Sequence, residues 1–511
     1  MKQRSNKRRL RYATVSLMLC VLVITSLIII NVIAAVLSMR YEWMYPELSR
    51  PAVYELSDGC REYISEHVMP EIEKKDGEKI KIIFCNTKEK LRSEELFKYV
   101  YDSFFDVAEL FSGKIEIEHL DILEQPSVAQ KYGVDSVTDV DCAFGDRYEM
   151  LDLRDFYSYK TVDGQSVATA YNGEALIASC LMRVTQEKVP VCYFTVNHGE
   201  EFADYELVKA ISQSGYTVGF LDLYADEIPN DCELLVTLNP KKDLAIGTDT
   251  SSVSETERLD EYMSSGGKYM VFLSADTFAS GGFENMETFL ASWGVDYMHK
   301  RTDAGVEACY LVKDSASSLT VDGYTVLARL FESDNGDGII DVSGAPCAFG
   351  NTTYMSVSEG FSPDGDGRFV SKETKRSLIP LFSAYSTAVA WADGRPVARA
   401  AEEDFILMSL TEEDCGGGKK AHLVASASVD FASEYAMQSV SLGNSRAISE
   451  LIRYMGKDNA PSGLVPKPMG QTEIQSLTSQ NANIITTVLV ALPAVLITTT
   501  GVVVLVRRKN R

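Results

Sequence analysis

Two long apolar runs lie near the two ends of this chain, from about Ala13 to Ser38 and from about Ile484 to Val506. Each exceeds the roughly 20 residues that an α-helix needs to cross the hydrocarbon core of a bilayer. Because Lys and Arg beside a span favour the cytoplasm, both termini are predicted inside the cell and the segment between the runs outside it. The basic residues that carry this prediction are Lys2, Arg4, Lys7, Arg8, Arg9 and Arg11 before the first run, and Arg507, Arg508, Lys509 and Arg511 after the second.

Each run has an alternative interpretation. The first can be a cleaved signal peptide, although such a peptide has an apolar core of only about 7–15 residues. Ala34-Ala35 is the nearest approach to a small-residue cleavage site. The second can be a buried core helix. We predict membrane helices at 13–38 and 484–506, with cytoplasmic basic tails at 1–12 and 507–511.

Charge and cysteine usage limit the function of the outer segment. The formal net charge is −24, and without the ten terminal basic residues 39 Lys and Arg remain against 73 Asp and Glu. So acidic a segment is not expected to bind nucleic acid or to lie on anionic lipid. Its nine cysteines are scattered without a C-x-x-C pair, which argues against a zinc ribbon or a thioredoxin-type redox motif. Which of them pair, if any, stays open.

The first outer region, 40–185, shows strand-like and helix-like patterns in turn. Apolar residues at helical spacing mark 93–111, and short apolar runs mark the strands. The predicted helices are 54–69, 93–111, a short one that opens at Pro126, and 166–186; the predicted strands are 80–85, 114–122, 142–144 and 148–153. This order is typical of a thioredoxin-like layer without its redox cysteines.

The second outer region, 189–456, alternates strands with helices of about 10–13 residues, a pattern that indicates a parallel sheet with helices on both faces. We expect a doubly wound, flavodoxin- or Rossmann-like α/β domain, with a β-rich insertion at about 295–400 and a linker at 457–483. The predicted strands are 189–200, 217–223, 233–240, 268–276 and 422–431; the predicted helices are 202–214, 254–265, 283–293 and 445–455.

Three stretches of this region resemble the GldG-like family, auxiliary membrane components of ABC-type transport systems. They are VCYFTVNHGEEFADYELVKAISQSGYTVGFLDLYADEIPNDCELLVTLNPKKDLA, LDEYMSSGGKYMVFLSAD and HLVASASVDFASEYAMQSVSLGNSRAISELIRYMG. The resemblance covers 190–280 and 420–456 well, 80–185 loosely and 295–400 poorly. Asn197 departs from the family, which more often has Gly before His-Gly-Glu. The resemblance implies a non-catalytic subunit that works beside an ABC-2-type permease and a cytoplasmic ATPase in the bilayer.

The best candidate for a ligand-binding site is the turn Asn197-His198-Gly199-Glu200. It follows the first strand of the second region, and ligands of doubly wound sheets bind outside the carboxyl ends of the strands. His198 and Glu200 are suited to bind a polar ligand there, or simply to order the turn. Ser428, Asp430 and Asn444 lie in the last strand and the loop that follows it, and they are predicted near the same edge. A Ser/His/Asp catalytic triad can be drawn from these residues, but no G-x-S-x-G surrounds Ser428.

Two Asp/Gly clusters, Ser333–Gly338 and Ser362–Gly367, invite a calcium interpretation. In the second cluster Asp364, Asp366 and Glu373 fall at ligand positions of an EF-hand loop, although Ser362 replaces the first Asp. A surface turn is the simpler interpretation, and we predict no metal and no cofactor. Gly416–Lys420 lacks the spacing of a phosphate loop and is expected as a hairpin or linker turn.

The sequence therefore predicts a two-span membrane protein that is not an enzyme and whose outer α/β domain binds or guides a substrate or a partner. A freestanding envelope receptor for an extracellular polymer or sugar is the first alternative. An envelope enzyme that depends on the His198 turn is the second.

Overall fold

The structure is a computed structural model whose contacts divide the chain into Met1–Glu55 and Leu56–Arg511. The description below concerns the second unit. The described residues are 56–469 except 76, 123, 125–133, 135, 163–164, 201, 203–205, 248–253, 280–281, 303–304, 331–338, 343, 440, 457–459, 462 and 465. Within them, no helix is both long and apolar enough to cross a membrane. The predicted spans, the basic tails, the short helix after Pro126, the Asp/Gly cluster at 333–338 and most of the linker lie outside the described residues.

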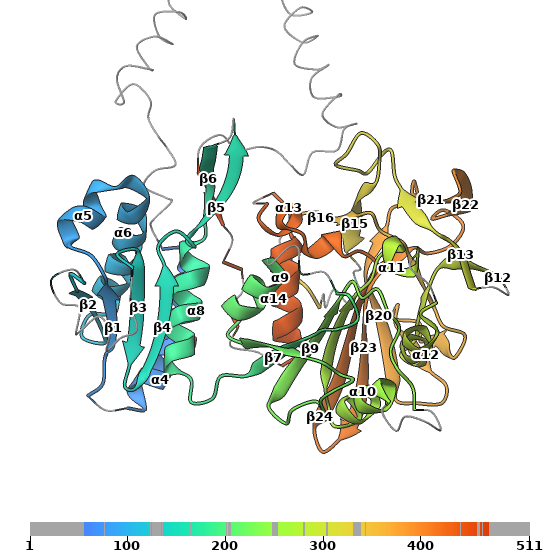
Figure 1. The fold of residues 1–511 in the computed structure, drawn as a ribbon, viewed down its shortest axis with the longest axis horizontal. Helices are drawn as coiled ribbons and strands as arrows, with labels where there is room; N and C mark the ends of the chain where they lie inside the picture. The colour runs from blue at the N-terminus through green and yellow to red at the C-terminus, as the bar shows by residue number, and fades with distance from the viewer. Residues whose placement is uncertain are drawn as a thin grey trace, which may run out of the picture. The chain divides into compact units, whose positions relative to one another are not determined.

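The first sheet forms around an isoleucine-rich strand (Figure 1). Its order is β2 (Ile115–His119), β1 (Ile80–Phe84), β3 (Asp139–Phe144) and β4 (Arg147–Asp152). β1 runs parallel to β2 and antiparallel to β3. Helix α6 (Glu95–Leu110) buries Val100, Phe104 and Val107, which recur at helical spacing, and Phe104 meets Phe84 of β1 edge to face. α5 (Lys88–Ser93) precedes this helix.

The helix predicted at 166–186 is half wrong. Residues Gln165–Tyr171 form strand β6, which pairs antiparallel with β5 (Tyr157–Val162), and only Gly173–Thr185 form a helix, α8. The apolar residues of this segment have helical spacing, but the hydrogen bonds between β5 and β6 decide its structure and make its first part a strand. The helix predicted at 54–69 is instead α3 (Asp58–Tyr63), a π-helical turn η2 (Ile64–Val68) and α4 (Met69–Glu73).

The main sheet contains both parallel and antiparallel strands. Its order is β16 (Cys347–Gly350), β15 (Thr325–Leu330), β20 (Arg376–Ala384), β23 (Ile406–Gly416), β24 (Lys419–Ser426), β10 (Lys268–Phe272), β9 (Cys232–Leu238), β7 (Val191–Thr195) and β8 (Thr217–Leu221). The strands from β24 to β8 are parallel, and those from β16 to β24 are antiparallel. The predicted hairpin turn is confirmed, because Gly416–Gly418 connect β23 to β24 with positive φ.

Both faces of the parallel part are buried, because alternate side chains enter two different cores. Met270 and Phe272 of β10 pack in one core with residues of α9 (Glu206–Gln213) and α14 (Asn444–Tyr454). Tyr269 and Val271 pack in the other with residues of α10 (Glu255–Ser264) and α12 (Glu284–Ser292). This double burial explains the continuous apolar runs of these strands.

The segment predicted as a β-rich insertion, 295–400, takes part in the main sheet. It supplies β15, β16 and β20, and β20 lies between β15 and β23. β17 (Met355–Val357) pairs with β11 (Val295–Tyr297) and β23. β18 (Phe361–Pro363) pairs with β19 (Phe369–Ser371), which pairs in turn with β20 of the main sheet. Two smaller sheets are separate from it: β12 (His299–Thr302) with β13 (Gly305–Cys309), and β14 (Leu311–Lys313), β21 (Val389–Ala392) and β22 (Arg395–Arg399) in that order.

The first and last described segments meet at Glu174, in the first turn of α8. Its buried carboxylate accepts hydrogen bonds from Ser57 N–H (2.7 Å) and Ser57 Oγ (2.5 Å), just before α3. The same carboxylate lies 2.6 Å from Lys467 Nζ. Lys467 belongs to β25 (Lys467–Pro468), which pairs with β6. Glu174 therefore links the segment that follows the first predicted span to the segment that precedes the second.

We expect replacement of Glu174 by Ala to lower the free energy of unfolding by about 2 kcal/mol, because Ser57 and Lys467 lose a charged acceptor. Urea denaturation of the full chain measures this loss. The control Glu71→Ala removes a solvent-exposed ion pair with Lys74 and should change stability by less than about 0.5 kcal/mol. Equal losses in the two variants would contradict the role assigned to Glu174.

Candidate functional site

The predicted turn lies directly after β7, where the chain changes direction between strand and helix. Asn197 and Gly199 have φ values of 77° and 79°, so the turn uses left-handed backbone at two of its four residues. Lys241 N–H, just beyond β9, donates to His198 O (2.7 Å) and fixes the turn to the neighbouring strand end. A Cβ on Gly199 would lie 3.1 Å from Lys241 Cβ, so both the space and the φ favour glycine.

The His198 ring lies between two carboxylates. Its Nε2 is 3.0 Å from Glu255 Oε2 at the start of α10, and its Nδ1 is 3.5 Å from Glu200 Oε1. Glu200 also accepts from His198 N–H (2.8 Å). His198 is buried, and the Glu200 and Glu255 side chains are each only 1% exposed. Both ring nitrogens therefore face carboxylates, and neither faces a serine.

The polar contacts continue into the sheet. Thr195 Oγ1 donates to Glu200 Oε1 (3.0 Å) and lies 2.8 Å from Thr237 Oγ1, which accepts from Tyr269 OH (2.8 Å). Glu255 Oε2 also accepts from Ala245 N–H (2.6 Å). A polar network thus runs from β10 through β9 and β7 to the N-terminus of α10. Such networks stabilise one arrangement only when their members are satisfied.

The charges in this network follow from its geometry. Burial lowers the pKa of His198, but the hydrogen bonds and charges of Glu200 and Glu255 outweigh burial and raise that pKa to about 10. Burial raises the pKa of Glu200, and its hydrogen bond with His198 reverses this effect, so that the pKa lies below its ordinary value. At neutral pH the site is therefore a buried ion pair, and a histidine held in this charged form is a poor general base.

The other three predicted residues have partners of their own around β16. Ser428 Oγ donates to Gly350 O (2.6 Å), and Asn351 Nδ2 donates to Asp430 Oδ2 (2.9 Å). Asn444, fully buried at the start of α14, exchanges hydrogen bonds with the backbone of Ala348 and donates to Phe431 O; the three distances are 2.8–3.0 Å. The structure thus brings Asn197, His198, Gly199 and Glu200 together, and places Ser428, Asp430 and Asn444 in a second set of contacts that ties α14 to β16. A ligand-binding role for these residues stays a prediction.

The second Asp/Gly cluster forms the turn between β18 and β19. Asp364 Oδ1 accepts from the backbone N–H groups of Asp366 (2.9 Å) and Arg368 (3.2 Å), so one expected ligand is engaged in closing the turn. No group of three His, Cys, Asp or Glu side chains suited to a metal ion occurs in the part of the chain that the structure describes.

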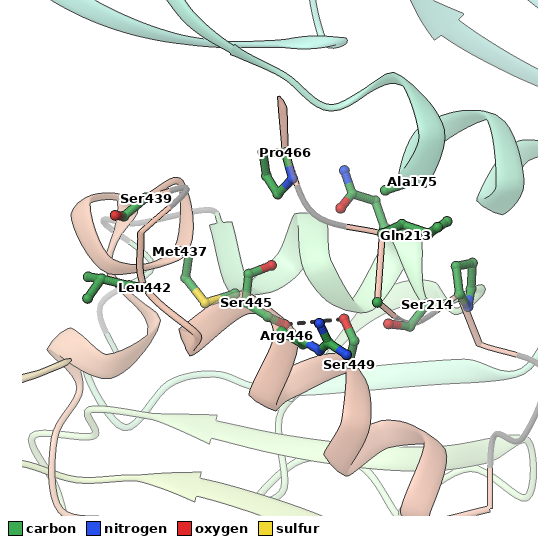
Figure 2. A pocket seen from close by; sticks show the side chains of 13 residues that line it. Ala175, Gln213, Ser214, Met437, Ser439, Leu442, Ser445, Arg446, Ser449 and Pro466 are labelled. Atoms are coloured by element: carbon green, nitrogen blue, oxygen red, sulfur yellow. Dashed lines mark hydrogen bonds between the residues drawn. The ribbon is translucent and has the colours of Figure 1, made fainter. Parts of the chain in front are cut away.

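A cavity of about 40 Å³ lies beside α14, and none of the residues that line it is among the predicted site residues (Figure 2). Its walls come from α8, α9, α13 (Glu434–Met437), α14 and the last described segment of the chain. The lining residues are Ala175, Gln213, Ser214, Met437, Ser439, Leu442, Ser445, Arg446, Ser449, Pro461, Gly463, Leu464 and Pro466. They come from distant parts of the sequence, so no motif could have indicated the cavity before the fold was known.

Residues 187–305 match the family described as "ABC-type uncharacterized transport system". The matched part extends from just before β7 to the start of β13, and it includes the His198 network, α9, α10 and α12. The finding supports an auxiliary role in ABC-type transport. A search among curated proteins finds no match.

Several solved structures are similar in outline. The N-terminal domain of mmIFT52 has 14% sequence identity, a TM-score of 0.35, and coverage of 52% of this chain and 97% of that one. A cytoplasmic protein from Salmonella typhimurium has 10% identity, a TM-score of 0.26, and coverage of 48% and 92%. PurLQS from Thermotoga maritima has 12% identity, a TM-score of 0.25, and coverage of 52% and 98%. These scores are too low to carry an argument about function.

Replacement of His198 by Gln should lower the free energy of unfolding by about 3 kcal/mol at neutral pH, because two buried carboxylates lose their positive partner. Urea denaturation followed by circular dichroism measures the loss. The control is His67→Gln on η2, where the ring packs against Tyr63, and there we expect a loss of less than about 1 kcal/mol. A His198 variant as stable as the control would contradict the ion pair.

The stability that His198 confers should also depend on pH. A pKa raised from 6.5 to about 10 on folding stabilises the native state fully below pH 6.5, and this stabilisation is lost as the pH rises through about 10. The stability difference between the natural chain and His198→Gln should therefore shrink in denaturation curves taken at about pH 6, 8 and 10. A difference that stays constant over this range would contradict a charged His198.

Proposed function

We propose that this protein is a membrane-anchored, non-catalytic auxiliary subunit of an ABC-type transport system, of the GldG-like type. The observation that carries the proposal is the match of residues 187–305 to the ABC-type transport family. The apolar runs at 13–38 and 484–506 support the anchoring, with both termini in the cytoplasm and a doubly wound α/β domain outside.

The proposed mechanism is contact rather than chemistry. The two membrane helices would pack on an ABC-2-type permease, and the outer domain would bind or guide the transported substrate. ATP hydrolysis would belong to a cytoplasmic ATPase partner. The His198 network is compatible with this view, because its groups form a buried ion pair that orders the turn.

A second candidate function is a freestanding envelope receptor. The cavity beside α14 favours it, because a receptor requires a binding site of its own and the cavity combines polar with apolar walls. The two functions differ in their partners. The auxiliary subunit requires a permease and an ATPase, whereas the receptor requires neither.

Affinity purification of the full chain from its native membrane in a mild detergent separates the two functions. We expect a polytopic permease and an ATPase to co-purify and to be identified by mass spectrometry. As a matched control, residues 13–38 are replaced by an unrelated apolar span of equal length, which keeps the anchor and removes specific helix contacts. Co-purification should fall in the control. Recovery of the natural chain alone, in a detergent that preserves other membrane complexes, would overturn the proposal and favour the receptor.

A further inference from the structure

The cavity beside α14 has one strong hydrogen-bond donor that lacks an acceptor. Arg446 is 19% exposed, and one terminal nitrogen of its guanidinium lies 3.1 Å from Asp341 Oδ2. Its Nε is buried and has no hydrogen-bond partner among the described residues. A buried, unpaired donor on a charged group is costly, and a ligand that supplies an acceptor would relieve this cost.

The rest of the lining combines polar and apolar side chains. Ser445 precedes Arg446 in α14, and Ser449 follows one turn later, where its hydroxyl donates to Ser445 O (3.2 Å; Figure 2). Ser439 and Gln213 add further polar groups, and Met437, Leu442 and Leu464 supply apolar surface. The set can donate several hydrogen bonds around one positive charge, which is the arrangement that an oxyanion requires.

A neighbouring hollow shares part of this lining and adds a second cation. It includes Ala175, Gln213, Met437 and Ser445 of the cavity, and also Lys209 and Glu206. Glu206 accepts a hydrogen bond from Gln438 Nε2 (2.7 Å), so its carboxylate is engaged within the wall. One basic side chain therefore lines each of these neighbouring hollows, in a chain whose net charge is −24.

We propose that the cavity is a binding site for a small oxyanion, a carboxylate or a phosphate group, with Arg446 as its main ligand-binding residue. The guanidinium of Arg446 supplies the positive charge, and Ser445 and Ser439 belong to the same lining and supply further hydroxyl donors. The apolar residues allow the ligand to carry a short apolar part. This inference goes beyond the proposed function and does not depend on it.

The ligand would also stabilise the last segment of the domain. Pro461, Gly463, Leu464 and Pro466 form one wall, and a Cβ placed on Gly463 would lie only 3.7 Å from a terminal nitrogen of Arg446. The next residue after this wall, Lys467, is paired with Glu174, and Met469 N–H donates to Thr169 O (2.7 Å). A ligand held between α14 and this wall would therefore slow the detachment of the segment that leads toward the second predicted span.

Isothermal titration of the full chain in detergent with inorganic phosphate and, separately, with acetate tests the proposal at constant ionic strength, with chloride as the reference salt. We expect saturable binding of at least one anion, and the better binder distinguishes a phosphate from a carboxylate ligand. Arg446→Gln should weaken binding about 10-fold or more, because a charge-assisted hydrogen bond is lost. Arg453→Gln, on the same helix but paired with Glu450 at the surface, should bind like the natural chain.

A second variant keeps the test decisive if Arg446→Gln folds poorly. Ser449→Met fills the cavity from α14 without changing any charge, and it should abolish binding. Hydrogen exchange of residues 460–469 should be slower with the bound anion than with chloride in the natural chain only. No saturable binding of either anion, or equal binding by the natural chain and both cavity variants, would overturn the proposal. Neither result depends on whether a permease co-purifies.

Discussion

Burial of both faces of the central strands is the constraint on which the rest of the fold depends. β10 has neighbours on both sides and sends Met270 and Phe272 into one core and Tyr269 and Val271 into the other. Because neither face of these strands contacts water, helices must cover both faces of the sheet. α9 and α14 cover one face, and α10 and α12 cover the other. Polar groups buried within these strands then need partners, which Thr195, Thr237 and Tyr269 find in one another.

The His198 network is the consequence of this constraint at one strand end. A turn that must leave a buried strand carries backbone and side-chain polar groups into a site with little water, and each group needs a partner. His198 pairs with Glu200 and with Oε2 of Glu255 together, whereas the buried Oε1 of Glu255 has no hydrogen-bond partner among the described residues. The cost of burying three ionisable groups is offset only by their mutual contacts. The resulting arrangement holds β7, the turn and α10 in one geometry.

The sequence predicts these local features better than it predicts the pairing of distant segments. The helix at 254–265 is confirmed as α10, and Ser254 caps it by accepting from Glu257 N–H, because both signals are local. The strand part of 166–186 was hidden, since β6 exists only through its hydrogen bonds with β5. The place of β20 between β15 and β23 depends on partners far along the chain. The turn at 197–200 is predictable from the sequence because its signal is local, like that of α10. The cavity at Arg446 is not, because its walls come together only in the folded chain.

Glu174 and the cavity together give the domain a short physical path between its two ends. Arg446 adjoins Gly463, four residues before Lys467, whose ammonium group pairs with Glu174, and that carboxylate also accepts from Ser57. The Lys467–Glu174–Ser57 part of this path uses charge-assisted hydrogen bonds, which are stronger than hydrogen bonds between neutral groups. β25 follows Pro466 of the cavity wall directly and pairs with β6, so the wall is covalently continuous with the Lys467–Glu174 contact. We therefore expect a ligand in the cavity to change the arrangement of the segments around Ser57 and Lys467. A ligand that binds one arrangement better shifts the equilibrium toward that arrangement.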